Sequence, residues 1–107
     1  MRLIHVTAKH NLDSIKANGL DPKFATMKRR AVWGVSPSNE AWAVAHTLGK
    51  PRAAGLSIHD HVTIEVDVPR SWLRRHKRGI WYCLKTITED RFIEVRESSR
   101  IGEEYPH

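Results

Sequence analysis

Residues 61–68 read HVTIEVDV, and their alternation is the clearest structural signal in the sequence. Aliphatic side chains stand at every second position: Val62, Ile64, Val66 and Val68. The polar residues between them, Thr63, Glu65 and Asp67, complete the pattern of a strand with one buried and one solvated face. Pro69 then ends the strand, because proline cannot donate to a sheet ladder. We therefore expect a sheet in which this strand has one face in the core.

Two strand–helix pairs are expected upstream of this strand. Apolar residues predict a short strand over residues 2–6, followed by a helix over 11–19 with Asn11 as its N-cap. A second strand over about residues 31–36 leads into a helix over 37–49. Both helices reach a glycine, the residue that most often terminates a helix.

Three elements are expected downstream. A short helical turn over residues 71–75 precedes a strand over 79–84, and a last strand covers about 91–96. The order is strand, helix, strand, helix and then three strands. This order predicts an α+β fold, with helices packed on a mostly antiparallel sheet. Residues 1–97 form a single domain in this prediction, and 98–107 form a polar C-terminal tail.

The composition describes one small basic domain. The chain has 107 residues, 40% of them hydrophobic, and 18 Lys and Arg against 12 Asp and Glu give a net charge of +6. Apolar runs are too short to cross a bilayer, and the single cysteine, Cys83, excludes an intramolecular disulfide. We expect a cytoplasmic protein without membrane association. The positive charge indicates a polyanionic partner, such as nucleic acid or a phosphate-bearing small molecule.

Two short stretches carry side chains that could bind a ligand. His5 and Thr7 lie two residues apart on the first strand, so they point to the same face and can address one ligand. Trp33, next to a glycine, offers a flat stacking face, and Ser36 stands at a helix N-terminus that favours a phosphate. Each stretch also has a structural interpretation. His5 can be an ordinary edge-strand histidine, with Thr7 at the entry to the helix. Trp33 can be a core tryptophan and Ser36 an ordinary helix cap.

Three other features favour structural roles. The second helix carries apolar residues on one side: Ala41, Trp42, Ala45 and Leu48. Trp42 and His46 share a face of this helix, and such a stripe is typical of a helix side packed in the core. The His-Asp-His segment at 59–61 lacks the further ligands that a tetrahedral zinc site needs. Cys83 lies in an apolar strand and is expected to be an inert buried thiol.

Basic residues gather at three places: 28–30, Arg52 and 74–78. Solvated charge is a sufficient explanation for any one of them, but three in so short a chain favour a phosphate-rich partner. The side chains predicted to contact a nucleic acid are Arg29, Arg30, Arg52, Arg74 and Arg75.

Several short stretches together resemble the ADP-ribosyltransferase fold. LIHVT at 3–7, NLDSI at 11–15 and GLDP at 19–22 look like the opening of that superfamily, where a first-strand His-x-Thr precedes a helix and a Gly-Leu-x-Pro turn. Residues 33–38 look like its strand ending in small hydroxyl residues before a helix, and 79–82 look like its late strand. In particular, the chain is similar to DNA-modifying ADP-ribosyltransferase toxins and NAD-dependent RNA 2′-phosphotransferases.

The resemblance implies a small split antiparallel or mixed sheet with two main helices and a cleft that binds NAD, or a related nucleotide, as substrate. His5 would contact the nicotinamide ribose, Val6 would hold the carboxamide through its backbone, and Thr7 would support both. Trp33 would lie near the stacking aromatic ring and Ser36 near the phosphates or ribose. The protein would be an NAD-binding ADP-ribosyltransferase-like domain acting on a nucleic-acid or protein acceptor.

One departure from the family bears on the chemistry. Enzymes of this fold place a glutamate on the late strand, near Ile80 here, but residues 79–84 contain no carboxylate. Three glutamates could take its place only with a different strand register: Glu65, Glu89 and Glu94. The 2′-phosphotransferases rely on basic residues instead, and Arg30 would then act with His5 in catalysis. The alternative function is a non-catalytic basic module that binds nucleic acid.

Overall fold

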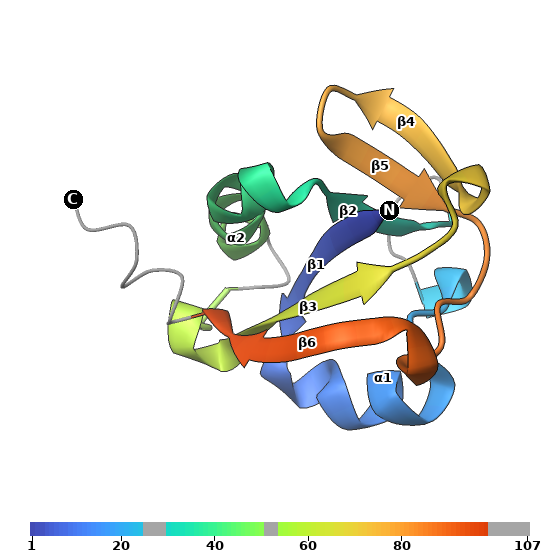
Figure 1. Ribbon diagram of the computed structural model, residues 1–107. Coiled ribbons are helices and arrows are strands. Elements are labelled where there is room, and N and C mark those ends of the chain that lie inside the picture. The colour runs from blue at the N-terminus through green and yellow to red at the C-terminus, as the bar shows by residue number, and fades with distance from the viewer. Residues whose placement is uncertain (25–29, 51–53, 99–107) are drawn as a thin grey trace.

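The computed structural model describes residues 1–24, 30–50 and 54–98. Within these ranges a six-stranded sheet has the strand order β4-β5-β2-β1-β3-β6, and two α-helices, α1 (Leu12–Asn18) and α2 (Glu40–Leu48), pack on it (Figure 1). The strands are β1 (Arg2–Ala8), β2 (Val32–Val35), β3 (His61–Asp67), β4 (Leu73–Lys77), β5 (Ile80–Cys83) and β6 (Phe92–Glu97). Every neighbouring pair is antiparallel. The predicted α+β class is confirmed, and the sheet is antiparallel rather than mixed.

The sheet has two sections, β4-β5-β2 and β1-β3-β6, that meet at β1 and β2. β1 pairs with β3 over seven residue pairs, from Arg2 opposite Asp67 to Ala8 opposite His61. Its pairing with β2 consists of Ile4 opposite Val35. The sections therefore form one connected sheet and not two separate ones, but their junction is short.

The helices cover opposite faces of this sheet. Leu3 belongs to the larger core cluster, against which Ile15 of α1 packs. The next residue, Ile4, belongs to a second cluster with Val35 of β2 and Ala43 of α2. Consecutive strand residues point to opposite faces, so α1 and α2 lie on either side of β1. In the described ranges, neither helix has the length and apolar character needed to span a membrane.

The strand β3 is buried on more than its aliphatic face. Its aliphatic residues are in the core as predicted, but Thr63, expected on a solvated face, is also fully buried. Its Oγ1 lies 3.1 Å from the Oγ of Ser98, and this hydrogen bond lets both hydroxyls leave water. Ser98 is therefore part of the packed domain, although the prediction placed it in the tail. The rest of the predicted tail, 99–107, lies outside the described residues.

The basic run 74–78 supplies most of an edge strand that the sequence analysis missed. The predicted helical turn over 71–75 is a 3-10 turn at Arg70–Trp72, and β4 (Leu73–Lys77) follows it. Leu73 is buried and the rest of β4 is exposed, so no apolar alternation marks this strand in the sequence. Charged side chains on an edge strand discourage further pairing with other chains.

The apolar stripe of α2 does not face the core, contrary to prediction. Trp42 is 47% exposed, and its neighbours on that stripe, Ala41 and Ala45, are exposed as well. The buried residues of this helix are Glu40, Ala43 and Val44. Glu40 turns inward because its carboxylate pairs with Arg96 of β6. This ion pair, which the helical pattern does not reveal, links α2 to β6.

Arg96 joins α2 to β3 and β6. Its guanidinium hydrogen-bonds Glu40 and lies 3.6 Å from Glu65 and 3.1 Å from Glu94. Only 15% of the Arg96 side chain is exposed, and Glu40 and Glu65 expose 11% and 12% of theirs. Burial by itself would lower the pKa of Arg96, but the hydrogen bond and charge of Glu40 outweigh it and raise that pKa above its ordinary value.

Candidate functional site

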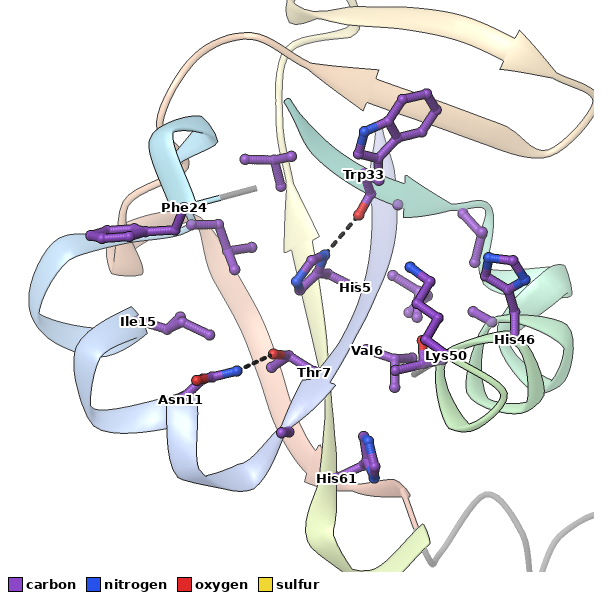
Figure 2. A pocket seen from close by; sticks show the side chains of 18 of the residues that line it. His5, Val6, Thr7, Asn11, Ile15, Phe24, Trp33, His46, Lys50 and His61 are labelled. Carbon is purple, nitrogen blue, oxygen red and sulfur yellow. Dashed lines mark hydrogen bonds between the residues drawn. The ribbon is translucent and has the colours of Figure 1, made fainter. Parts of the chain in front are cut away.

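A cavity of about 740 Å³ opens where β1 and β2 separate (Figure 2). Residues 4–8 of β1, residues 31–35, both α-helices and the segment after α1 contribute to its walls. Its volume falls within the range of small-molecule sites, roughly 300–1,000 Å³. The structure brings four of the predicted site residues together in its lining: His5, Val6, Thr7 and Trp33.

His5 stands between the two strands. Its Nδ1 lies 2.7 Å from the carbonyl oxygen of Trp33, as Figure 2 shows, and a carbonyl can only accept, so Nδ1 carries the hydrogen. The imidazole thus donates to a carbonyl oxygen that would accept from a backbone N–H of β1 if β1 and β2 continued to pair. The next three residues of β1, Val6, Thr7 and Ala8, line the cavity.

Thr7 is positioned from the start of α1. Asn11 is at the predicted N-cap position, but its side chain makes no capping hydrogen bond. Its Nδ2 instead donates to the Oγ1 of Thr7 at 3.1 Å. This contact orients the threonine hydroxyl at the cavity wall and leaves its hydrogen for donation to another group.

Trp33 contacts other aromatic rings of the protein. Its ring lies 5.1 Å from Tyr82 at a 39° tilt and 5.1 Å from His76 in an edge-to-face arrangement. Its Nε1 is buried and has no hydrogen-bond partner among the described residues. Trp33 is therefore a wall of the cavity whose ring is already partly covered, rather than the open stacking face expected from the sequence.

Exposed aromatic rings come from two residues that the sequence analysis did not assign to the site. Trp42 of α2 stacks on His46 with ring centres 4.7 Å apart and a 12° interplanar angle, and 47% of it is exposed. Phe24, in the segment after α1, is 60% exposed. Both line the cavity. The Trp42–His46 spacing was visible in the sequence, but the pattern indicated a core position.

The titratable side chains make the cavity positive. Five of the seven histidines of the chain line it: His5, His10, His46, His61 and His76. Lys50 and Lys77 line it as well, and Figure 2 shows Lys50 extending from the end of α2 toward the middle of the cavity. Asp21 is the single carboxylate among the described lining residues. Even with neutral histidines, this lining suits an anionic ligand.

The segment that carries Asp21 is held in place by its backbone. Leu20 and Ile87 exchange two backbone hydrogen bonds, of 2.8 and 2.9 Å. Gly19 before them has a φ of +77°, and a Cβ there would meet the carbonyl oxygen of Ile87 at 2.7 Å. The Oδ1 of Asp21 accepts the backbone N–H of Lys23 at 2.9 Å. These contacts fix the carboxylate at the cavity edge.

The other predicted site residues lie elsewhere. Ser36 does not line the cavity; its Oγ accepts a 3.4 Å hydrogen bond from Trp81. Arg30 is exposed and is not a lining residue, and Arg74 and Arg75 are exposed on β4. The predicted contacts Arg29 and Arg52 lie outside the described residues.

No glutamate lines the described part of the cavity. Glu65 and Glu94 belong to the Arg96 network, and Glu89 is exposed on the 3-10 turn Glu89–Arg91. Ile80, at the position where the resemblance implies a glutamate, does line the cavity. A carboxylate can therefore act in this cavity only from Asp21, among the residues described.

The segment 59–61 has a structural role at the start of β3. Asp60 accepts the backbone N–H of Ser57 at 2.8 Å, and this hydrogen bond lowers the pKa of Asp60. The Nδ1 of His61 donates to the Ser57 carbonyl at 2.8 Å. Among the described residues, no group of three ligating side chains could hold a metal ion. Cys83 is fully buried, as predicted.

The sequence matches no protein-family model, and a search of curated proteins finds no match.

Proposed function

We propose that this cavity binds NAD and that the protein is a minimal ADP-ribosyltransferase-like domain, which transfers ADP-ribose from NAD to a nucleic-acid or protein acceptor. The position of His5 carries the proposal. Its imidazole stands between β1 and β2 in a positive cavity with exposed aromatic rings in its lining.

Each part of NAD has a complementary group in this lining. Trp42 and Phe24 offer faces on which the two heterocyclic rings can stack. Lys50 and Lys77 supply positive charge for the pyrophosphate. The His5 ring and the adjoining β1 backbone supply hydrogen-bonding groups for a ribose and a carboxamide.

Asp21 is the candidate for stabilising charge in the proposed reaction. The bond between ribose C1′ and the nicotinamide nitrogen breaks, and nicotinamide leaves as a neutral molecule with the electron pair. The ribose then carries a positive charge, which a nearby carboxylate stabilises. An acceptor oxygen or nitrogen forms the new bond to C1′ and releases its proton to water.

The test of binding is a calorimetric titration with NAD of the protein, of His5→Ala and of His59→Ala. His59 is an exposed histidine outside the cavity lining, so its variant is a matched control. We expect saturable binding by the protein and the control, and an affinity loss of about tenfold or more in His5→Ala. Thermal denaturation checks that both variants are folded. An absence of heat at millimolar NAD, or equal binding by all three proteins, would contradict the proposal.

The test of chemistry is the release of nicotinamide from NAD by Asp21→Asn. Asparagine can still accept the N–H of Lys23, so the substitution removes charge and keeps the turn. We expect release to fall by about 100-fold while NAD affinity is retained. Asp13→Asn on α1, whose side chain is exposed and outside the cavity, is the control. Equal turnover by the two variants would exclude Asp21 from the reaction.

The second candidate function is a non-catalytic module that binds nucleic acid. The exposed arginines of the edge strand β4, Arg74 and Arg75, favour it, because the same strand supplies His76 and Lys77 to the cavity. It predicts that a single-stranded oligonucleotide binds with an affinity that falls steeply between about 50 and 200 mM salt. Anisotropy measurements on Arg74→Gln with Arg75→Gln would show weaker binding. Such binding without any NAD turnover would favour this function.

A further inference from the structure

We infer that ligand binding in this cavity is coupled to proton uptake by its histidines, so that the site fills more readily below neutral pH. The inference rests on the proposed function, because it takes a pyrophosphate-bearing nucleotide as the ligand. The five histidines come from five elements: His5 of β1, His10 of the turn after β1, His46 of α2, His61 of β3 and His76 of β4. An imidazole ordinarily becomes a cation below roughly pH 6.5.

An anionic ligand changes the electrostatic surroundings of these histidines. Without ligand, Lys50 and Lys77 oppose further positive charge in the cavity. The negative charge of Asp21 offsets these two lysines only in part, because its Oδ2 also lies 3.8 Å from the Nζ of Lys23. A pyrophosphate adds two negative charges, which favour the protonated form of each histidine nearby. By linkage, protonation then strengthens binding of the ligand by the same factor.

His46 and His76 are the histidines that we assign to this role. Both are exposed, so water can share the charge of their cationic form. His46 lies flat against Trp42, at 4.7 Å and 12°, where a cation interacts favourably with the ring. His61, by contrast, is 1% exposed and its Nδ1 donates to the Ser57 carbonyl, so we leave it out of this assignment.

The experiment is a calorimetric titration of the protein with ADP-ribose at pH 6.0, 7.0 and 8.0, in buffers of different ionisation enthalpy. The pyrophosphate of ADP-ribose keeps its charge over this range, unlike a terminal phosphate, whose second pKa is about 6. We expect the affinity to be about tenfold higher at pH 6.0 than at pH 8.0. The dependence of the observed heat on the buffer would show the uptake of protons directly.

Variants of single histidines and histidine pairs identify the side chains that take up the protons on binding. The double variant His46→Gln with His76→Gln should take up fewer protons and bind ADP-ribose with little dependence on pH. His59→Gln should behave like the unchanged protein, because His59 lies outside the cavity. Binding without proton uptake would overturn the coupling, and undiminished uptake by the double variant would overturn its assignment to these residues. A protein that binds neither NAD nor ADP-ribose at any of the three pH values would instead reject the proposed function, and the coupling with it.

Discussion

The strand β1 makes very different contacts along its two edges. Toward β3 it pairs over seven residue pairs, and the aliphatic side chains on that side, such as Ile64 and Val66, are fully buried. Toward β2 it pairs at Ile4 and Val35, after which the His5 side chain separates the strands and the cavity begins. One strand therefore stabilises the fold along one edge and exposes polar groups along the other.

The largest effect on stability is expected in the β1-β3-β6 section of the sheet. Ile64→Ala removes a side chain that is 0% exposed in β3, and we expect a loss of about 2–5 kcal/mol in the free energy of unfolding. Ile93→Ala in β6, where the isoleucine is 45% exposed, should cost less than about 1 kcal/mol. Urea denaturation of both variants measures the difference. Similar losses would show that the two positions are equally packed.

The Arg96 network is the next test, because it links α2 to β3 and β6. Arg96→Met removes the guanidinium from the buried carboxylates of Glu40 and Glu65, of which Glu65 keeps Arg2 at 3.5 Å, and we expect a loss of about 3 kcal/mol in the free energy of unfolding. Arg74→Met on the exposed strand β4 is the control. Urea denaturation at pH 7 compares the two variants, and equal stability would contradict this role.

The junction of β1 and β2 can be tested through its glycine. A Cβ on Gly34 would lie 2.5 Å from the Leu3 side chain and 3.0 Å from the Ile4 carbonyl oxygen. We expect Gly34→Ala to cost about 1–3 kcal/mol, because the sections of the sheet must move apart. Gly49→Ala is the matched control, since its Cβ would meet its nearest neighbours at 3.6 Å. Thermal denaturation should give a lower melting temperature for Gly34→Ala than for Gly49→Ala. An unchanged melting temperature in Gly34→Ala would mean that the junction has room for a Cβ.

The smallest effect concerns the turn before β3. The Ser57 N–H lowers the pKa of Asp60 in the folded state, so its carboxylate stabilises the fold above the unfolded-state pKa. This contribution is lost as the pH falls through the lowered pKa. Asp60→Asn should therefore lower the melting temperature slightly at pH 7 and hardly at all near pH 2.5. A difference that grows in acid would contradict this sign.

Elements with a strong local pattern were predictable from the sequence. The alternation over 61–68 located β3, and the glycines that follow the helical stretches located the ends of α1 and α2. His5, Thr7 and Trp33, which the sequence analysis singled out as candidate site residues, all line the cavity. Their role as ligands of NAD remains a prediction of the resemblance.

What the sequence determined by itself is the α+β class, the position of most elements and the burial of the aliphatic residues of β3, because these depend on the spacing of neighbours along the chain. Tertiary structure decided the rest. The strand β4 forms through pairing with β5 and not through any apolar pattern of its own. The apolar stripe of α2 faces outward, while Glu40 of the same helix is buried and pairs with Arg96 of β6. The cavity and its histidines arise because distant segments meet where β1 and β2 stop pairing, and no local spacing encodes such a meeting.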